Sequence, residues 1–233
     1  MIPLPDVSSN RGTSRARPRP TRRSRSESFR RAEILDAAVA RFGRDGYETT
    51  KWADIADDVG IGATALYHYF DSKQHCLYVI LVQALEELHE RFDTITATHA
   101  DPRQALPAVC TDCFALSERD VLRNRVLVAE QALLSQERSS QREEEARRAG
   151  RDKTRALEIA WARFLADAMH QGAIPERDPR MLARALLGLY NSIWHWYRPD
   201  QTLPLPTIAE FFIPRMLAVA GVPPEPSEVA AAD

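Results

Sequence analysis

Apolar positions in the first third of the chain recur every three to four residues, a spacing that predicts helices rather than strands. A first helix should end at Gly43 and Gly46, and a second, very short helix should stop at Gly60. Only the turn 60–62, with glycine at both ends, separates the second helix from a third helix. Two short helices joined by so short a turn are typical of a helix-turn-helix. The positions that carry this pattern are Ile34, Leu35, Ala38, Val39 and Phe42 in the first helix, Trp52, Ile55, Ala56 and Val59 in the second, and Leu66 and Phe70 in the third.

Longer helices are predicted for the rest of the chain. Asp71 and Gln74 have the spacing of a capping box at the start of a long helix, and Pro102 opens another, which Pro107 either kinks or delays. No alternation typical of a strand occurs, so we predict an all-α protein of about nine helices. The charged stretch 141–153 is either the solvated face of a helix or a loose connection. The remaining helices are expected over residues 119–135, 137–171, 178–198 and 206–221.

Composition indicates an ordinary globular protein, since 44% of the 233 residues are hydrophobic and 27% are charged. The sequence has neither an apolar run long enough to span a membrane nor the apolar stretch of a secretory signal, so we expect a cytoplasmic protein with no membrane partner. An odd count of three cysteines argues against a disulfide framework. The net charge of −2 would also argue against nucleic-acid binding, if charge were evenly spread.

Charge is in fact strongly uneven along the chain. Residues 1–31 contain nine arginines against two carboxylates, a net +7, whereas the remainder has 22 basic and 31 acidic residues, a net −9. A basic end on an acidic body is typical of a protein that touches phosphate with one end only. We therefore expect a disordered basic arm at 1–26, a DNA-binding domain at 27–73, a ligand-binding and dimerisation domain at 74–221, and a disordered tail at 222–233.

The segment 34–77 resembles the DNA-binding domain of the TetR family of transcriptional regulators. The resemblance is carried by the helix-one face with Phe42, the turn at Gly46 and Tyr47, Thr50, the pairs 55–56 and 59–60, and the run LYHYF at 66–70 followed by Ser72 and Lys73. It implies a homodimer that presents two recognition helices about one duplex turn apart, roughly 34–36 Å, to a palindromic operator in double-stranded DNA. Lys51 and Gly62 depart from the family pattern, which usually has hydroxyl side chains there.

The third helix would enter the major groove, and its small N-terminal side chains would allow close approach. It offers no Arg, Asn or Gln for purines, so Thr64 and shape readout would carry much of the specificity. The arginines before the first helix could enter the minor groove. The residues expected to contact DNA are Arg22, Arg23, Arg25, Thr50, Lys51, Ala63, Thr64, Ala65, Tyr67, His68, Tyr69 and Lys73.

The C-terminal half would hold the effector and the dimer interface, which in TetR-like proteins is a four-helix contact of the last two helices of each subunit. The stretch 191–199 resembles a signature of TetR-like regulators of fatty-acid and sterol catabolism, matching at Asn191, Trp196, Tyr197 and Pro199. Several of those regulators sense acyl-CoA thioesters, so the resemblance implies a small apolar effector of that kind. Six aromatic residues could line an apolar pocket for it: Phe92, Phe114, Trp161, Phe164, Tyr190 and Trp194.

Catalytic signatures are not apparent, and we expect neither an enzyme nor a cofactor. Cys110 and Cys113 form a C-x-x-C, but the sequence has no second cysteine pair for zinc and no βαβ pattern for a redox site. His89 begins an H-E-x-x-H motif that Asp93 breaks. The leading hypothesis is a ligand-responsive regulator, a repressor released from DNA by its effector. The alternatives are the same class of regulator sensing an aromatic or drug-like ligand, and a helical redox or metal protein centred on the two cysteines.

Overall fold

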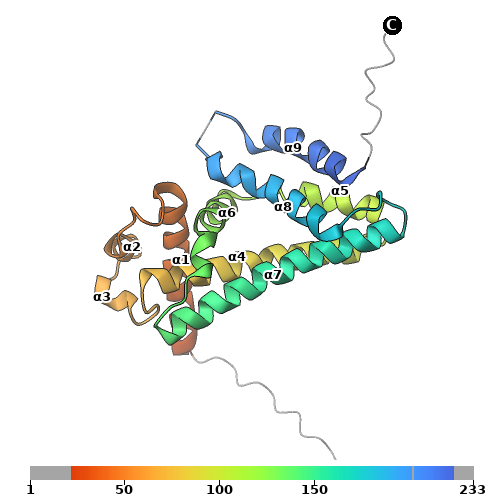
Figure 1. The fold of residues 1–233 in the computed structure, drawn as a ribbon. Coiled ribbons are helices and arrows are strands. Elements are labelled where there is room, and N and C mark those ends of the chain that lie inside the picture. The colour runs from red at the N-terminus through yellow and green to blue at the C-terminus, as the bar shows by residue number, and fades with distance from the viewer. Residues whose placement is uncertain (1–21, 201, 223–233) are drawn as a thin grey trace, which may run out of the picture.

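The computed structural model describes residues 22–200 and 202–222, and within these ranges it consists of helices and connecting turns without a strand (Figure 1). The prediction of an all-α protein is confirmed. The helices are α1 (Arg22–Asp45), α2 (Trp52–Asp58), α3 (Ala63–Leu66), α4 (Lys73–Thr98), α5 (Pro102–Asp112), α6 (Glu118–Glu130), the 3₁₀ helix η1 (Gln131–Ser135), α7 (Gln141–His170), α8 (Pro179–Trp196) and α9 (Leu205–Ala220).

The first three helices share a small core at one end of the molecule (Figure 1). Ile55, Leu66 and Phe70 are completely buried there, and Phe70 meets the ring of Trp52 edge-on with centroids 6.3 Å apart. Helices as short as α2 and α3 are not stable alone in water. Burial of such a side chain contributes about 1.5–3 kcal/mol, so packing against α1 is what keeps them in place.

The body is organised around two long helices, α4 and α7, of 26 and 30 residues. They lie side by side and both begin at the end that carries α2 and α3 (Figure 1). α8 packs on α7, and α9 covers α8 and α5. α6 contacts α1, α4 and α8, so it joins the N-terminal helices to the body.

Two local features differ from the expectations, and two that the sequence left open are decided. α1 already begins at Arg22, so residues 22–26 are helical, whereas a disordered arm was expected up to residue 26; the last proline of this region, Pro20, comes before them. The cap of α4 is Ser72, whose Oγ accepts from the His75 N–H at 3.0 Å, and not Asp71. α5 begins at Pro102 and continues through Pro107. The charged stretch 141–153 is the regular first half of α7, opened by the Ser140 cap.

Residues 1–21 and 223–233, where we expect disorder, lie outside the described residues. α9 closes at Gly221, which has a left-handed φ of 87°, and the Val222 N–H donates to the Leu217 carbonyl at 2.9 Å. No helix in the described ranges combines the length and apolarity that crossing a bilayer requires.

Candidate DNA-binding face and ligand pocket

The turn between α2 and α3 has the tight geometry of a helix-turn-helix. Gly60 adopts a left-handed φ of 67°, which a residue without Cβ tolerates, and the Ile61 N–H donates back to the Ala56 carbonyl at 3.0 Å. α3 is a single turn that ends at Leu66, shorter than the sequence suggested. The chain continues through 67–70 in turns, with the Phe70 N–H bonded to the Leu66 carbonyl at 3.0 Å.

Most of the residues predicted to contact DNA share the outer side of this unit. Lys51, Ala63, Thr64, Tyr67 and His68 are exposed, and the Tyr67 side chain is the most notable because 56% of this large aromatic residue is accessible. Ala65 and Tyr69 are half-buried. These seven residues are therefore exposed or partly exposed, whereas Leu66 and Phe70 are buried in the core.

Thr50 and Lys73 are engaged within the protein. Thr50 is only 4% exposed, and its Oγ1 donates to the Gly46 carbonyl at 2.7 Å. The Lys73 ammonium donates to the carbonyls of Tyr47 and Thr50 at 2.7 and 2.9 Å and lies 4.2 Å from the centroid of the Tyr47 ring. Both side chains thus hold the turn that joins α1 to α2. One of the three ammonium N–H groups of Lys73 takes part in neither of these bonds.

Contacts from α1 hold α2 and its turn. Arg41 donates to both carboxylate oxygens of Asp58 at 2.7 Å, which lowers the pKa of that carboxyl. Arg30 donates to the Val59 carbonyl at 3.2 Å. Arg22, Arg23 and Arg25 lie in the first turns of α1, but their side chains are outside the described part of the structure.

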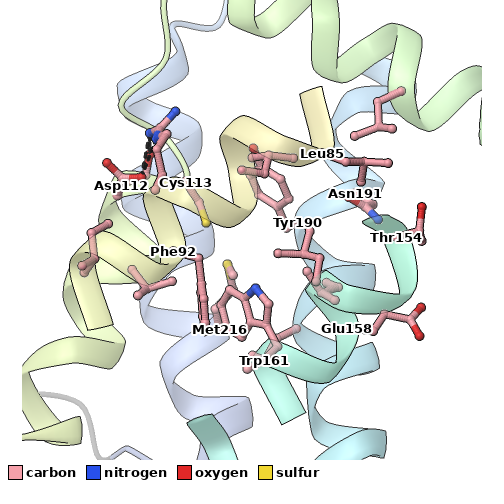
Figure 2. Close-up of a pocket in the computed structure, with 18 of the residues that line it drawn as sticks. Leu85, Phe92, Asp112, Cys113, Thr154, Glu158, Trp161, Tyr190, Asn191 and Met216 are labelled. Carbon is pink, nitrogen blue, oxygen red and sulfur yellow. Dashed lines mark hydrogen bonds and ion pairs between the residues drawn. The ribbon is translucent and has the colours of Figure 1, made fainter. Parts of the chain in front are cut away.

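A pocket opens in the body between α4, α5, α7 and α8, with an empty volume of about 900 Å³, part of it open to solvent (Figure 2). The space open to a water-sized molecule is about 100 Å³, less than the roughly 300–1,000 Å³ of typical small-molecule sites, but the lining is of the same kind, mostly apolar with a few polar groups. Its apolar and aromatic walls come from Leu85, Leu88, Phe92, Ile95, Val109, Leu127, Leu157, Trp161, Leu186, Leu187, Tyr190 and Met216.

Half of the aromatic residues proposed for the pocket line it, namely Phe92, Trp161 and Tyr190. The other three stand behind them as a second layer. Phe164 meets Phe92 edge-on at 5.8 Å, and Phe114 and Trp194 meet Tyr190 at 6.0 and 5.3 Å between centroids. These three support the ring positions and do not face the pocket.

Polar residues also line the pocket, although the sequence-based prediction for the pocket named aromatic residues alone. Thr154 and Glu158 precede Trp161 on α7 at spacings that place all three on one face, and Asn191 follows Tyr190 on α8. Figure 2 shows these three polar residues on one side of the pocket and Asp112 with Cys113 on the other. Helical spacing from the aromatic positions could have identified the α7 pair.

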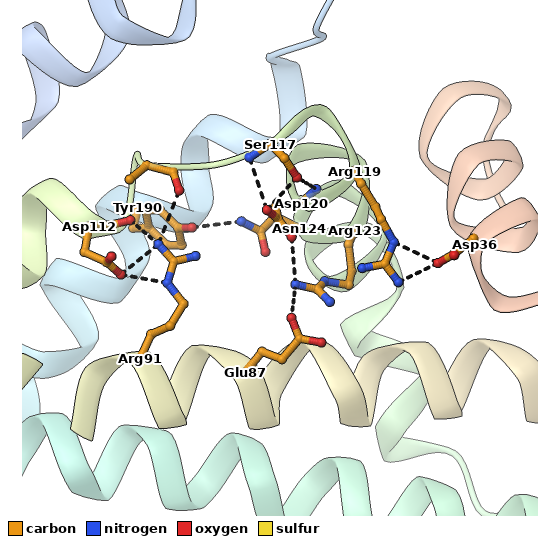
Figure 3. A network of polar contacts seen from close by, with 11 residues as sticks. Asp36, Glu87, Arg91, Asp112, Ser117, Arg119, Asp120, Arg123, Asn124 and Tyr190 are labelled. Atoms are coloured by element: carbon orange, nitrogen blue, oxygen red, sulfur yellow. Dashed lines mark hydrogen bonds and ion pairs between the residues drawn. The ribbon is translucent and has the colours of Figure 1, made fainter. Parts of the chain in front are cut away.

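A polar network on α6 connects the pocket to α1 (Figure 3). The Asn124 amide donates to the Tyr190 hydroxyl at 2.9 Å, and burial raises the pKa of Tyr190. The preceding residue, Arg123, pairs with Glu87 on α4 at 2.6 Å. At the start of α6, Arg119 pairs with Asp36 of α1.

Arg125 makes the most direct connection between the N-terminal helices and α8. Its Nε donates to the Gly43 carbonyl near the end of α1 at 3.0 Å. Its Nη1 donates to the carbonyls of Trp194, at 3.5 Å, and Tyr197, where α8 ends. One guanidinium therefore binds the C-terminal carbonyls of two helices, which lack partners within their own helix.

The two cysteines of the C-x-x-C lie at the end of α5 and not in its middle, since Cys113 is the residue that caps it. Burial raises the pKa of Cys110 to about 12 and also raises that of Cys113, which lines the pocket. A thiol is a poor nucleophile and metal ligand until it loses its proton, so these pKa values do not favour a redox or metal centre.

Comparison with known proteins decides the family. The model described as "Bacterial regulatory proteins, tetR family" matches residues 34–78, and "Tetracyclin repressor-like, C-terminal domain" matches residues 99–220, more than half of the chain. The chain belongs to the TetR family. It is thus a helix-turn-helix transcriptional regulator of the ligand-responsive type, as the resemblance in the first domain predicted.

Relatives of this TetR-family member include steroid-related repressors. It is 37% identical over 97 residues to the transcriptional repressor KstR2 of Rhodococcus jostii, a match covering 42% of this chain and 48% of the relative. It is 27% identical over 186 residues to KstR2 of Mycobacterium tuberculosis, covering 79% and 89%. Both relatives are described as transcriptional repressors.

Solved structures share its fold. The ketosteroid transcriptional regulator KstR2 of Mycobacterium tuberculosis superposes with a TM-score of 0.65 at 26% identity, over 81% of this chain and 93% of that one. The regulator AibR, solved with isovaleryl coenzyme A and operator DNA, superposes with a TM-score of 0.67 at 22% identity, over 80% and 97%. At this lower identity the likeness shows a common fold.

Proposed function

We propose that this TetR-family regulator is a homodimeric repressor that binds a palindromic operator and leaves it when an acyl-CoA thioester enters the pocket. The observation that carries the proposal is the apolar pocket on α4, α7 and α8, because α4 runs without a break from the helix-turn-helix into the pocket wall. A ligand that binds better to one arrangement of these helices shifts the population toward it. Operator release requires only that this arrangement fit DNA less well.

DNA binding is assigned to the exposed side of residues 51–68 together with Arg22, Arg23 and Arg25 at the start of α1. Lys51, Tyr67 and His68 can reach phosphates, and the small residues 63–65 allow approach to the groove. Thr64 remains our candidate for base contact, with Lys73 contributing its remaining N–H. The buried position of Thr50 makes it a support of the face.

Dimerisation is assigned to the outer side of α8 and α9, where apolar groups remain accessible. Met181, Trp196, Phe211 and Val219 are 64%, 44%, 52% and 37% exposed, and Gly188 adds a flat position between them. Exposed apolar surface of this extent is typical of protein interfaces. Two copies joined here would form the four-helix contact expected for the family.

The effector class is supported by the pocket and by related proteins. Asn191, a matching residue of the C-terminal signature, lines the pocket. AibR binds isovaleryl coenzyme A, and KstR2 is a ketosteroid regulator. An aromatic ligand is the second candidate, because the rings of Phe92 and Trp161 lie 5.0 Å apart on the wall and could stack on one.

The DNA proposal is tested by selecting bound duplexes from a random library. We expect an inverted repeat whose half-sites lie about one helical turn apart. Tyr67→Ala should weaken binding by about tenfold, since each subunit of the dimer loses a phosphate contact, while Tyr67→Phe separates the hydroxyl from the ring. If Tyr67→Ala and Lys51→Ala both leave affinity and its salt dependence unchanged, the proposed face is wrong.

The effector proposal is tested by thermal shift and by release of the selected DNA. Octanoyl-CoA should raise the melting temperature and weaken DNA binding, with an aromatic acid as the competing ligand class. Leu187→Trp should fill the pocket and abolish both effects. Ile159→Trp places the same bulk on an exposed site of α7 outside the pocket and should abolish neither. Stabilisation by aromatic acids alone would favour the second candidate.

A further inference from the structure

The pocket has two polar ends that differ in available charge. At one end Arg91 donates through Nε to an Asp112 carboxylate oxygen at 2.8 Å and through Nη2 to the Asp112 carbonyl at 2.5 Å (Figures 2 and 3). The two opposite charges satisfy one another, so this end offers an incoming ligand no net charge. A charged part of an effector would gain little there.

The opposite end continues into a surface groove. Gln131, Thr154 and Glu158 line the pocket and also line an adjoining hollow between η1 and α7, with an empty volume of about 690 Å³. Because the two spaces share three lining residues, a ligand whose apolar part fills the pocket can extend outward along this groove. Arg151 and Arg155 form its α7 side.

Among the basic residues in the first half of α7, these two arginines line the groove and differ from their neighbours in having no acidic partner. Arg147 and Arg148, one turn earlier, are both paired with Glu144 at 2.7 Å. Arg151 and Arg155 are exposed, and neither guanidinium makes an ion pair or hydrogen bond within the described ranges. They are four residues apart, so the two positive charges lie on the same side of the helix and repel one another.

Glu158 is the sole carboxylate that lines the groove, which leaves its lining with a net charge of +1. Glu158 also belongs to the pocket, so it lies nearer the apolar part, whereas Arg155 and Arg151 lie about one and two turns farther out along α7. Two guanidinium groups without partners beside an open groove match the geometry of phosphate, which they can bind by paired hydrogen bonds.

We propose that Arg151 and Arg155 form a subsite for the phosphate-bearing end of an effector whose acyl group occupies the pocket. The inference rests on the proposed function for the apolar half of the ligand and adds the recognition of its charged half. It would make the regulator select acyl groups carried on a phosphorylated thiol over neutral thioesters with the same chain.

The test compares three ligands on three proteins by titration calorimetry. Octanoyl-CoA carries phosphates, and octanoyl-pantetheine has the same acyl chain and thioester arm without them. Octanoyl-phosphopantetheine carries one phosphate and no nucleotide, so it shows whether a single phosphate is enough or the whole nucleotide is required. The proteins are the wild type, Arg151→Gln/Arg155→Gln, and the control Arg163→Gln/Arg177→Gln. The control removes two exposed positive charges from positions that line none of the described cavities.

The wild type and the control should bind octanoyl-CoA at least about tenfold more tightly than octanoyl-pantetheine. Arg151→Gln/Arg155→Gln should reduce that advantage to less than about twofold, leave octanoyl-pantetheine binding unchanged, and flatten the salt dependence. Equal loss in both double variants, or no loss in either, overturns the subsite and leaves the pocket intact. Failure of all three thioesters to bind the wild type overturns the effector proposal together with the subsite, whereas selection of an operator would still test DNA binding separately.

Discussion

We expect Arg125 to stabilise the contact between the N-terminal helices and the helical body. Its guanidinium reaches the Gly43 carbonyl of α1 and the Trp194 and Tyr197 carbonyls at the end of α8. Arg125→Met keeps the apolar stem and removes the three contacts. All three carbonyls then lose a charged donor in a partly buried location, where water replaces it only in part.

The expected loss of stability follows from the two stronger hydrogen bonds, because the third, to the Trp194 carbonyl, is long at 3.5 Å. A hydrogen bond to a charged group contributes about 1.5–3 kcal/mol, and partial exposure reduces this, so we expect the free energy of unfolding to fall by about 2–3 kcal/mol. Arg119→Met is the matched control. It also removes a contact from α6 to α1, but Arg119 and Asp36 are 49% and 54% exposed, and such pairs contribute about 0–1 kcal/mol.

Urea unfolding at fixed protein concentration measures both variants, and amide hydrogen exchange locates the effect. Exchange should accelerate in Arg125→Met at residues 44–47 and 195–198, the ends of the two helices. Arg125→Lys should recover only part of the loss, because a single ammonium cannot span both helix ends as the planar guanidinium does. If Arg125→Met costs no more than Arg119→Met, the reasoning about shared helix ends is wrong.

Three further predictions concern packing, pH and assembly. Gly43→Ala should lower the free energy of unfolding by about 1–3 kcal/mol, because the new Cβ would lie 2.7 Å from the Leu122 Cβ and 2.8 Å from the Leu122 carbonyl oxygen. Adding Leu122→Ala should not restore the stability, because alanine retains both of these Leu122 atoms. Burial lowers the pKa of His75, so the unfolded chain takes up its proton first; the melting temperature should fall as pH drops below about 6.5, and His75→Gln should reduce that fall. Phe211→Glu should convert the dimer to monomer in sedimentation, whereas Ile159→Glu on α7 should not; an unchanged dimer in Phe211→Glu would exclude this interface.

The helix-turn-helix could be predicted from the sequence because its signals are local. Glycines at the helix ends, a three-residue turn and apolar positions at helical spacing all act within a few residues. The same signals predicted the wrong end for the third helix, which ends at Leu66 and does not include Phe70. Burial of Phe70 is the same in a helix or in successive turns, so its apolar character could not decide between them.

Contacts between residues far apart along the chain could not be predicted from the sequence. Lys73 matched a family position associated with DNA, yet its ammonium bonds to carbonyls at Tyr47 and Thr50, an arrangement that depends on how α4 meets the preceding turn. Phe114, Phe164 and Trp194 had the same apolar character as the aromatics that line the pocket. Only the packing of α4, α7 and α8 determines which rings face the cavity and which stand behind it.

The parallel run of α4 and α7 has a mechanical consequence. At 1.5 Å per residue, the 26 residues of α4 extend about 39 Å from the helix-turn-helix past the pocket. A tilt of about 5° over that length would displace one end relative to the other by roughly 3 Å, close to the 3.4 Å rise of one base pair. An effector would therefore need to tilt the pocket wall by only a small angle to displace the helix-turn-helix end by a distance comparable to one base-pair step.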